Sequence, residues 1–207
     1  TGIAPSDITD HFGVDAFRYY FLRAIPFGSD GSFSWEDMSA RYTSELANDF
    51  GNLASRLAAM IEKYCGGKVP AVAKDESLAE SLKTTVEKAD AAMVALDFQG
   101  GINAVMDYCK KVNGFVTEKE PWILAKDPAN QATLEAVLYN TAESLRALAV
   151  LLHPVMPATT EILWESLGAK AALGEIRAQE ISKVATWGQL PEGAAVTKTP
   201  VLFPRRS

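Results

Sequence analysis

Residues 34–65 read SWEDMSARYTSELANDFGNLASRLAAMIEKYC, and this stretch decides the fold. No proline interrupts it. Ser34 followed by Asp37 resembles a helix-starting capping box, and Gly66-Gly67 is a typical C-terminal stop. We therefore expect one helix of roughly 30 residues, about 45 Å long at about 1.5 Å per residue.

Downstream of this helix, apolar residues recur with helical spacing in four further segments. The segments are residues 76–96, residues 98 or 101 to 119, residues 132–152 and the shorter 158–167. Prolines and short loops separate them, so neighbouring helices should run antiparallel. The predicted fold class is therefore mainly all-α, an antiparallel helix bundle.

The N-terminal residues 1–33 predict a small α/β adaptor. A short helix capped by Ser6 or Asp7 should end at Gly13, and a second should start at Asp15. After a turn, residues 32–34 suggest a brief extended segment. The bundle should then occupy residues 34–168.

Residues 169–207 lose the strong helical period, which predicts a largely irregular C-terminal arm that packs back on the body. Val201-Leu202-Phe203 is its expected apolar anchor, and Trp187 is expected to pin the arm to the bundle. Trp35 and Trp164 are interpreted as packing residues.

Bulk composition excludes several classes of protein. A formal charge of −6 and a pI near 5.0 argue against a generic nucleic-acid coat, which is normally basic. The most apolar stretch, 148–155, is broken by His153 and Pro154, so no membrane span is expected. The chain does not open with a signal or transit peptide pattern, and we expect a cytoplasmic protein.

The search for catalytic and metal-binding motifs finds none. There is no glycine-rich phosphate loop, no nucleophile elbow and no metal-binding histidine pair. Cys65 and Cys109 are too few for a cysteine-only zinc site and are expected to be buried or half-buried free thiols. We expect no catalytic residue, no metal and no cofactor in this chain.

The long helix carries a row of three polar residues, namely Asn48, Asn52 and Arg56. Asparagine is a modest helix former and Gly51 costs about 1 kcal/mol against alanine, so local propensity does not explain this segment. The spacing of four places the row on one face. Amides can pair with base edges, and a guanidinium can bind phosphate or stack on a base, so the row suits single-stranded RNA. In the alternative reading the two amides hydrogen-bond between helices, while Arg56 pairs with Glu45 or Asp49.

A second candidate element is Pro121-Trp122. Pro121 should hold Glu120 in extended geometry and end the preceding helix, which leaves Trp122 at a corner between helices. An indole there could stack on a base, or it could simply pack under the bundle rim. Four lysines near it in the sequence suggest a local basic rim: Lys110, Lys111, Lys119 and Lys126.

In their order along the chain, these segments resemble the C-terminal part of bacterial methionyl-tRNA synthetases, a class I family. The matching stretches are 13–20, 26–34, 45–56, 120–122, 153–157 and 202–205. The start at Asp15 occurs in several class I synthetases. The pairing of Asn-Leu-Ala-Ser-Arg at 52–56 with the downstream Pro-Trp is more specific to the methionine enzyme.

The resemblance implies that the whole enzyme joins methionine to its tRNA using ATP with Mg²⁺. The HIGH and KMSKS signatures of the catalytic half are absent from this chain, which is therefore expected to be inactive alone. Residues 1–33 would contact the tRNA stem. Asn48, Asn52, Arg56, Pro121 and Trp122 would contact the CAU anticodon.

The expected partners are the tRNA for methionine and the N-terminal catalytic domain of the same enzyme. Family members often have Asn-x-Tyr where this chain has Asn113-Gly114-Phe115, which puts a tyrosine role there in doubt. No C-terminal dimerisation module follows Ser207, so a monomer is expected. Two other functions stay open: a helical scaffold that binds a protein through residues 196–204, and the anticodon bundle of another class I synthetase.

Overall fold

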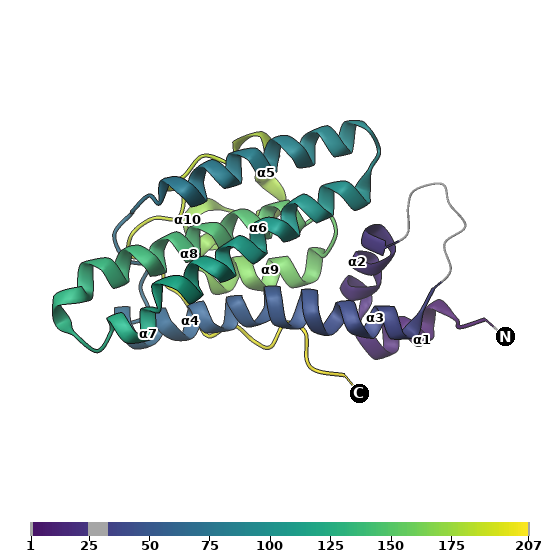
Figure 1. Cartoon of the computed structure of the whole chain (residues 1–207), viewed down its shortest axis with the longest axis horizontal. Helices are drawn as coiled ribbons and strands as arrows, with labels where there is room; N and C mark the ends of the chain where they lie inside the picture. The colour runs from purple at the N-terminus through teal and green to yellow at the C-terminus, as the bar shows by residue number, and fades with distance from the viewer. Residues whose placement is uncertain (1, 25–32, 207) are drawn as a thin grey trace.

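The architecture was obtained as a computed structural model, which describes residues 2–24 and 33–206. Four long helical stretches lie along one axis and alternate in direction (Figure 1). The first joins α3 (Trp35–Arg41), a π-helical segment η1 (Tyr42–Gly51) and α4 (Asn52–Cys65). The others are α5 (Glu76–Val94), α6 (Phe98–Lys119) and α8 (Gln131–Leu152). The predicted antiparallel bundle is confirmed.

Short polar caps explain where the long helices begin and end. The Ser34 hydroxyl accepts from the Asp37 N–H at 3.1 Å, as the capping pattern predicts. Asp75 and Asp97 cap α5 and α6 in the same way. Gly66 has φ +62°, so α4 ends in the left-handed conformation that glycine favours.

The centre of the bundle is α8, whose residues are almost all buried from Leu134 onward. Its burial on every side explains why its apolar residues do not confine themselves to one stripe. Buried within it are Glu143 and Arg146, joined by a salt bridge of 2.7 Å. Glu143 also accepts hydrogen bonds from the backbone N–H groups of Gly188, Gln189 and Leu190.

The N-terminal region forms two helices, α1 (Pro5–Phe12) and α2 (Val14–Ala24), at one end of the bundle (Figure 1). The N-cap of α1 is Ala4, so the prediction of a Ser6 or Asp7 cap was wrong by two or three residues. The expected turn, and Ser32 of the expected extended segment, lie outside the described residues. Phe33 and Ser34 form no strand.

Two side chains of α2 connect it to the bundle. The Asp15 carboxylate accepts from the Thr159 N–H at 2.6 Å, at the start of α9 (Pro157–Ser166). The Arg18 guanidinium donates to the carbonyls of Pro154 and Val155, just before that helix. The segments around Asp15 and Pro154, far apart in sequence, therefore meet at one junction.

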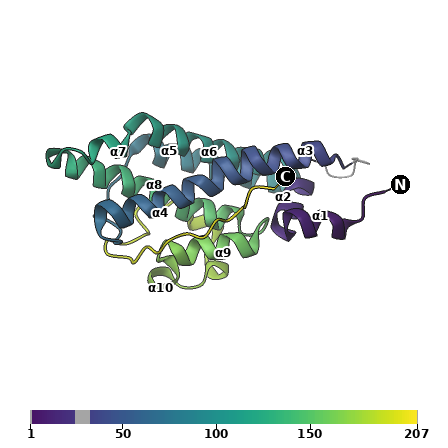
Figure 2. The ribbon, with the colours of Figure 1, turned by 90° about the horizontal axis from the view of Figure 1, so that it is seen from below.

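The C-terminal arm is largely irregular, as predicted, apart from α10 (Ala169–Leu173) and two short 3₁₀ turns (Ile176–Ala178 and Ile181–Lys183). It runs along α4 toward α2 (Figure 2). Trp187 donates to the Ala73 carbonyl and the Asn140 side chain, which confirms its pinning role. The anchor is narrower than predicted, because Phe203 is buried whereas Val201 is 70 % exposed.

Trp35 and Trp164, the two tryptophans interpreted as packing residues, pack as predicted. Trp164 is fully buried and donates to the Gly174 carbonyl at 2.9 Å. Trp35 packs against the rings of His11 and Phe12, with centroids 5.1 Å away in both cases. Within the described residues, no helix is both long and apolar enough to cross a membrane.

Candidate nucleic-acid interface

The predicted polar row lies on the outside of the long helix. Asn48 falls in the last turn of η1, and Asn52 and Arg56 fall in α4; all three side chains are exposed. Their buried neighbours on the same helix, Phe50 and Leu53, face the core. The helix therefore separates an apolar inner face from an amide-bearing outer face.

The two amides interact with each other and not across helices. Asn52 Nδ2 donates to Asn48 Oδ1 at 3.4 Å, a long hydrogen bond one helical turn apart. This bond uses one N–H of Asn52 and leaves its carbonyl oxygen and the Asn48 amide hydrogens available on two exposed side chains. Acceptors and donors are thus both available to a nucleic-acid base.

Arg56 does not form the acidic pair that the alternative reading required. Its guanidinium carbon lies 5.5 Å from the centroid of the Trp122 ring, a cation–π contact. Glu45 instead binds Arg23 at 3.4 Å and Arg41 at 3.3 Å, and it accepts a hydrogen bond from the Tyr19 hydroxyl. The structure therefore brings Arg56 and Trp122, 66 positions apart, to one place.

Trp122 lies on α7 (Pro121–Leu124), the one-turn helix between α6 and α8. Its side chain is 36 % exposed and its neighbour Ile123 is 45 % exposed, whereas Pro121 is buried. The corner therefore presents aromatic and aliphatic surface beside a polar row. Exposed Ile123 was not predicted, because a single apolar residue beside a tryptophan carries no separate signal in the sequence.

The corner is made differently from the prediction. Glu120 is not extended: it has φ +50° and ψ +59°, the left-handed region. Pro121 excludes the right-handed helix at Glu120, and a left-handed residue satisfies that restriction while reversing the chain in one step. The Glu120 N–H still bonds to Val116, and its carbonyl accepts from Ile123 and Leu124, so one residue ends α6 and starts α7.

Gly51 precedes Asn52 in the sequence but lies on the buried side of the long helix. A Cβ there would lie 3.1 Å from the Leu46 carbonyl of the same helix and 3.9 Å from the Phe203 ring. Gly51 is buried and faces the C-terminal arm. Its small size serves internal packing.

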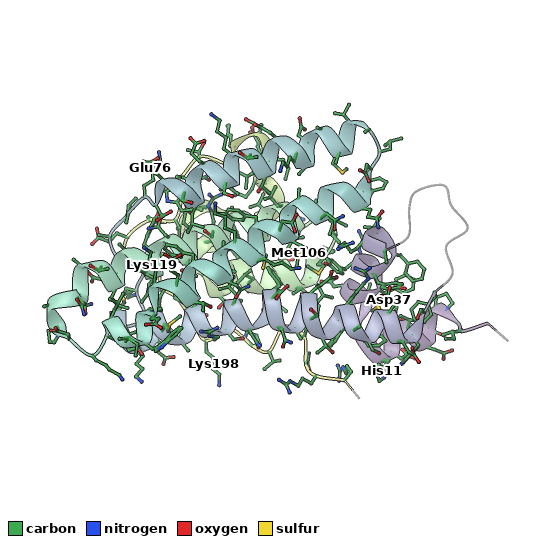
Figure 3. All side chains as sticks on the ribbon, viewed as in Figure 1. His11, Asp37, Glu76, Met106, Lys119 and Lys198 are labelled. Atoms are coloured by element: carbon green, nitrogen blue, oxygen red, sulfur yellow. The ribbon has the colours of Figure 1, made fainter. Side chains whose placement is uncertain are left out.

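The four lysines expected to form a basic rim lie along α6 and just after α7, on a chain with an acidic net charge. Lys110, Lys111, Lys119 and Lys126 are all exposed, and Figure 3 shows Lys119 at the end of α6 nearest α7. Lys110 lies close enough to Asp49 to lower the pKa of that carboxyl. Burial nevertheless outweighs this attraction and raises the Asp49 pKa above its ordinary value.

Residues 196–204, the segment suggested above as a protein-binding surface, pack against this chain itself. Val196, Thr199 and Phe203 are all buried against the body. The Ser166 hydroxyl bonds to the Thr199 hydroxyl at 2.6 Å, and the Tyr42 hydroxyl donates to the Pro204 carbonyl. The apolar side of the segment therefore covers this chain's own core.

Comparison with known families gives this face a context. Residues 75–193 match the family described as the anticodon-binding domain of tRNA ligases. The chain belongs to that family. Residues 1–58 match a second family, described as tRNA synthetases class I (M). Together the two matches cover the adaptor, most of the long helix and the remainder of the bundle.

Individual relatives agree with this membership. The methionine–tRNA ligase of Streptomyces coelicolor is 58 % identical over 99 % of this chain and 39 % of its own length. That of Halalkalibacterium halodurans is 40 % identical over 98 % of the chain and 31 % of its own length. This chain therefore spans less than half of the relatives that it matches.

Solved structures show the same arrangement of helices. The apo methionyl-tRNA synthetase of Mycobacterium tuberculosis superposes with a TM-score of 0.86 at 30 % identity, over 99 % of this chain and 41 % of that one. A form of that enzyme bound by methionyl-adenylate gives a TM-score of 0.83. The family resemblance inferred from the motifs is confirmed.

Proposed function

We propose that this chain reads the CAU anticodon of the tRNA for methionine, as part of a methionine–tRNA ligase. The observation that carries the proposal is the contact between Arg56 and Trp122, which joins the exposed amides to an exposed indole in one surface. Unpaired anticodon bases offer polar edges to the amides and a flat face to the indole.

Each of the five residues has a distinct part in this proposal. Asn48 and Asn52 hydrogen-bond to base edges, because their free donors and acceptors face outward. Trp122 stacks on a base and Arg56 binds phosphate or a base. Pro121 fixes the corner that presents the indole.

The whole protein, by the same proposal, joins methionine to this tRNA using ATP with Mg²⁺. The HIGH and KMSKS signatures are absent from this sequence, so no step of that chemistry is assigned to residues of this chain. Its contribution is binding. Residues 1–33 approach the tRNA stem and adjoin the catalytic domain, residues 34–168 read the anticodon, and residues 169–207 brace the bundle.

The proposal also places the protein in the cytoplasm as a monomer. Sedimentation of the whole protein with and without tRNA tests whether it is a monomer. A protein that sediments as a dimer at micromolar concentration contradicts it.

The decisive experiment measures binding of RNA hairpins to this chain. Trp122→Ala should weaken binding of a hairpin with a CAU loop by roughly five- to a hundredfold, since stacking on one base contributes about 1–3 kcal/mol. Asn52→Ala should also weaken it, whereas Asn103→Ala, a half-buried amide lining a different groove between α5 and α6, should not. Methionine activation by the whole protein should be unchanged in all three variants.

The loop sequence supplies the control. Hairpins whose CAU loop is replaced by another anticodon should bind the unmodified chain more weakly. Their affinity should change little when Trp122 or Asn52 is replaced. Equal binding of every loop sequence would contradict anticodon reading. Equal loss of methionine activation and RNA binding would indicate that these residues only maintain the fold.

A further inference from the structure

One side chain of α6 binds the backbone of the long helix between the two exposed amides. Asn113 Nδ2 donates to the Asp49 carbonyl at 2.8 Å and to the Cys109 carbonyl of its own helix at 3.2 Å. The Cys109 thiol contacts the same Asp49 oxygen at 3.4 Å. Asp49 directly follows Asn48, so Asn113 binds the long helix on the side opposite the predicted RNA-binding face.

The place of this connection is unusual in the helix. It falls near the end of η1, where π-helical geometry gives way to α-helix at Asn52. π-Helical segments are rare in proteins, and those that occur within long helices often lie at functional sites. The change in residues per turn falls between Asn48 and Asn52, and Asn113 binds the backbone carbonyl of Asp49 within this stretch.

The same α6 also determines where Trp122 lies. From Asn113 the helix continues without a break to Lys119, and Glu120 then connects it directly to α7. On the exposed side, Arg56 of α4 contacts the Trp122 ring. The two halves of the predicted site are thus joined twice, at Asn113 behind the surface and at Arg56 on it.

We propose that Asn113 is a positioning residue that sets the spacing between the amide pair and the Trp122 indole. This inference rests on the proposed RNA-reading function. The carboxamide touches no nucleotide; it holds the long helix and α6 at a separation that one anticodon loop can span. A loop that pairs with Asn52 and stacks on Trp122 at once requires that separation to be constant.

A test without RNA examines the position of Trp122 directly. In the ¹⁵N-labelled chain, Asn113→Ala should move the indole N–H resonance of Trp122, assigned by its loss in Trp122→Phe. The resonances of Trp164 and Trp187, which are held by their own hydrogen bonds, should stay in place. The matched control Asn103→Ala on the same helix should move none of them.

A second test uses the hairpin with a CAU loop and a double-mutant cycle. Asn113→Ala should weaken binding roughly five- to tenfold, the effect expected from about 1 kcal/mol for one lost hydrogen bond. In the Asn113→Ala background, Trp122→Ala should cost clearly less than it costs alone, because the indole is then already misplaced. Asn113→Asp, nearly the same size but unable to donate when ionised, should match Asn113→Ala.

The outcomes distinguish the two proposals. If Trp122→Ala and Asn52→Ala weaken binding but the Asn113 effect is absent or strictly additive, the positioning role is wrong and the RNA-reading function stands. An unmoved Trp122 resonance in both Asn113 variants also overturns it. If Trp122→Ala and Asn52→Ala leave binding unchanged, the proposed function itself fails, whatever the resonances show.

Discussion

The guanidinium of Arg56 lies over the ring of Trp122, with 5.5 Å between the guanidinium carbon and the ring centroid. Both side chains are exposed, so the contact is worth only about 0.5–1 kcal/mol and exchanges easily with a ligand. A base that stacks on the covered face of the indole would displace the guanidinium. Arg56 would then be free to reach a phosphate.

This relationship predicts a dual effect of Arg56→Gln. If Arg56 binds phosphate, its removal should weaken RNA binding and reduce the slope of log affinity against log salt by up to about one unit. Without RNA, the same change should increase quenching of Trp122 emission by iodide, measured as the difference from Trp122→Phe. An unchanged salt slope would contradict a contact between Arg56 and phosphate. Unchanged quenching would show that Arg56 does not cover the Trp122 ring in solution.

The buried pair Glu143–Arg146 predicts a large loss of stability from a single change. Arg146→Met leaves the Glu143 carboxylate buried without its cation, and breaking such a pair costs about 3–5 kcal/mol. Urea unfolding followed by circular dichroism measures the loss. The double variant Glu143→Gln with Arg146→Met should recover part of it, and Lys183→Met, an exposed ion-pair partner of Glu180, should change stability little.

Two left-handed glycines form a matched pair for testing the contact between α9 and the C-terminal arm. Gly66 and Gly168 have similar φ values of +62° and +75°, so alanine strains the backbone alike at both, by about 1–2 kcal/mol. A Cβ at Gly66 meets nothing within 4 Å, whereas one at Gly168 would lie 2.5 Å from the Ala195 carbonyl oxygen. Gly168→Ala should therefore lower Tm clearly more than Gly66→Ala; equal losses would contradict the close approach of the arm.

The two thiols should differ in reactivity. Burial raises the pKa of Cys109 to about 12, and it raises the pKa of the half-buried Cys65 as well. At pH 8 both are protonated, and Cys109 is also shielded from reagents. Native labelling with a thiol-specific disulfide reagent should modify Cys65 slowly and Cys109 only on unfolding. Cys65→Ser supplies the control, since native labelling should then disappear.

The Asp49 carboxyl predicts a pH-dependent stability. Burial raises its folded-state pKa above the unfolded value, with the attraction of Lys110 only partly offsetting this, so the ionised form disfavours folding. Its penalty is therefore present at neutral pH and diminishes as pH falls through the folded pKa. Asp49→Asn should raise Tm at pH 7 and give a smaller gain near pH 4. An equal gain at both values would assign the effect to packing and not to charge.

The sequence alone determined the helices and the family. Helical spacing, prolines and glycine stops predicted the long stretch 34–65 and its antiparallel neighbours within a few residues, because these signals act locally. The candidate face was predictable too, since Asn48, Asn52 and Arg56 recur every fourth residue on one helix. The two asparagines have weak helical propensity, so helix formation alone does not account for them.

Tertiary structure decided which distant groups meet. Spacing along one helix could not show that Arg56 contacts Trp122 and not Glu45, because three other residues from α2 and α3 compete for that carboxylate. The left-handed turn at Glu120 and the Asn113–Asp49 bond likewise depend on how α6 lies against the long helix. The buried pair in α8 had no signal in the sequence, because charged residues look exposed until packing encloses them on every side.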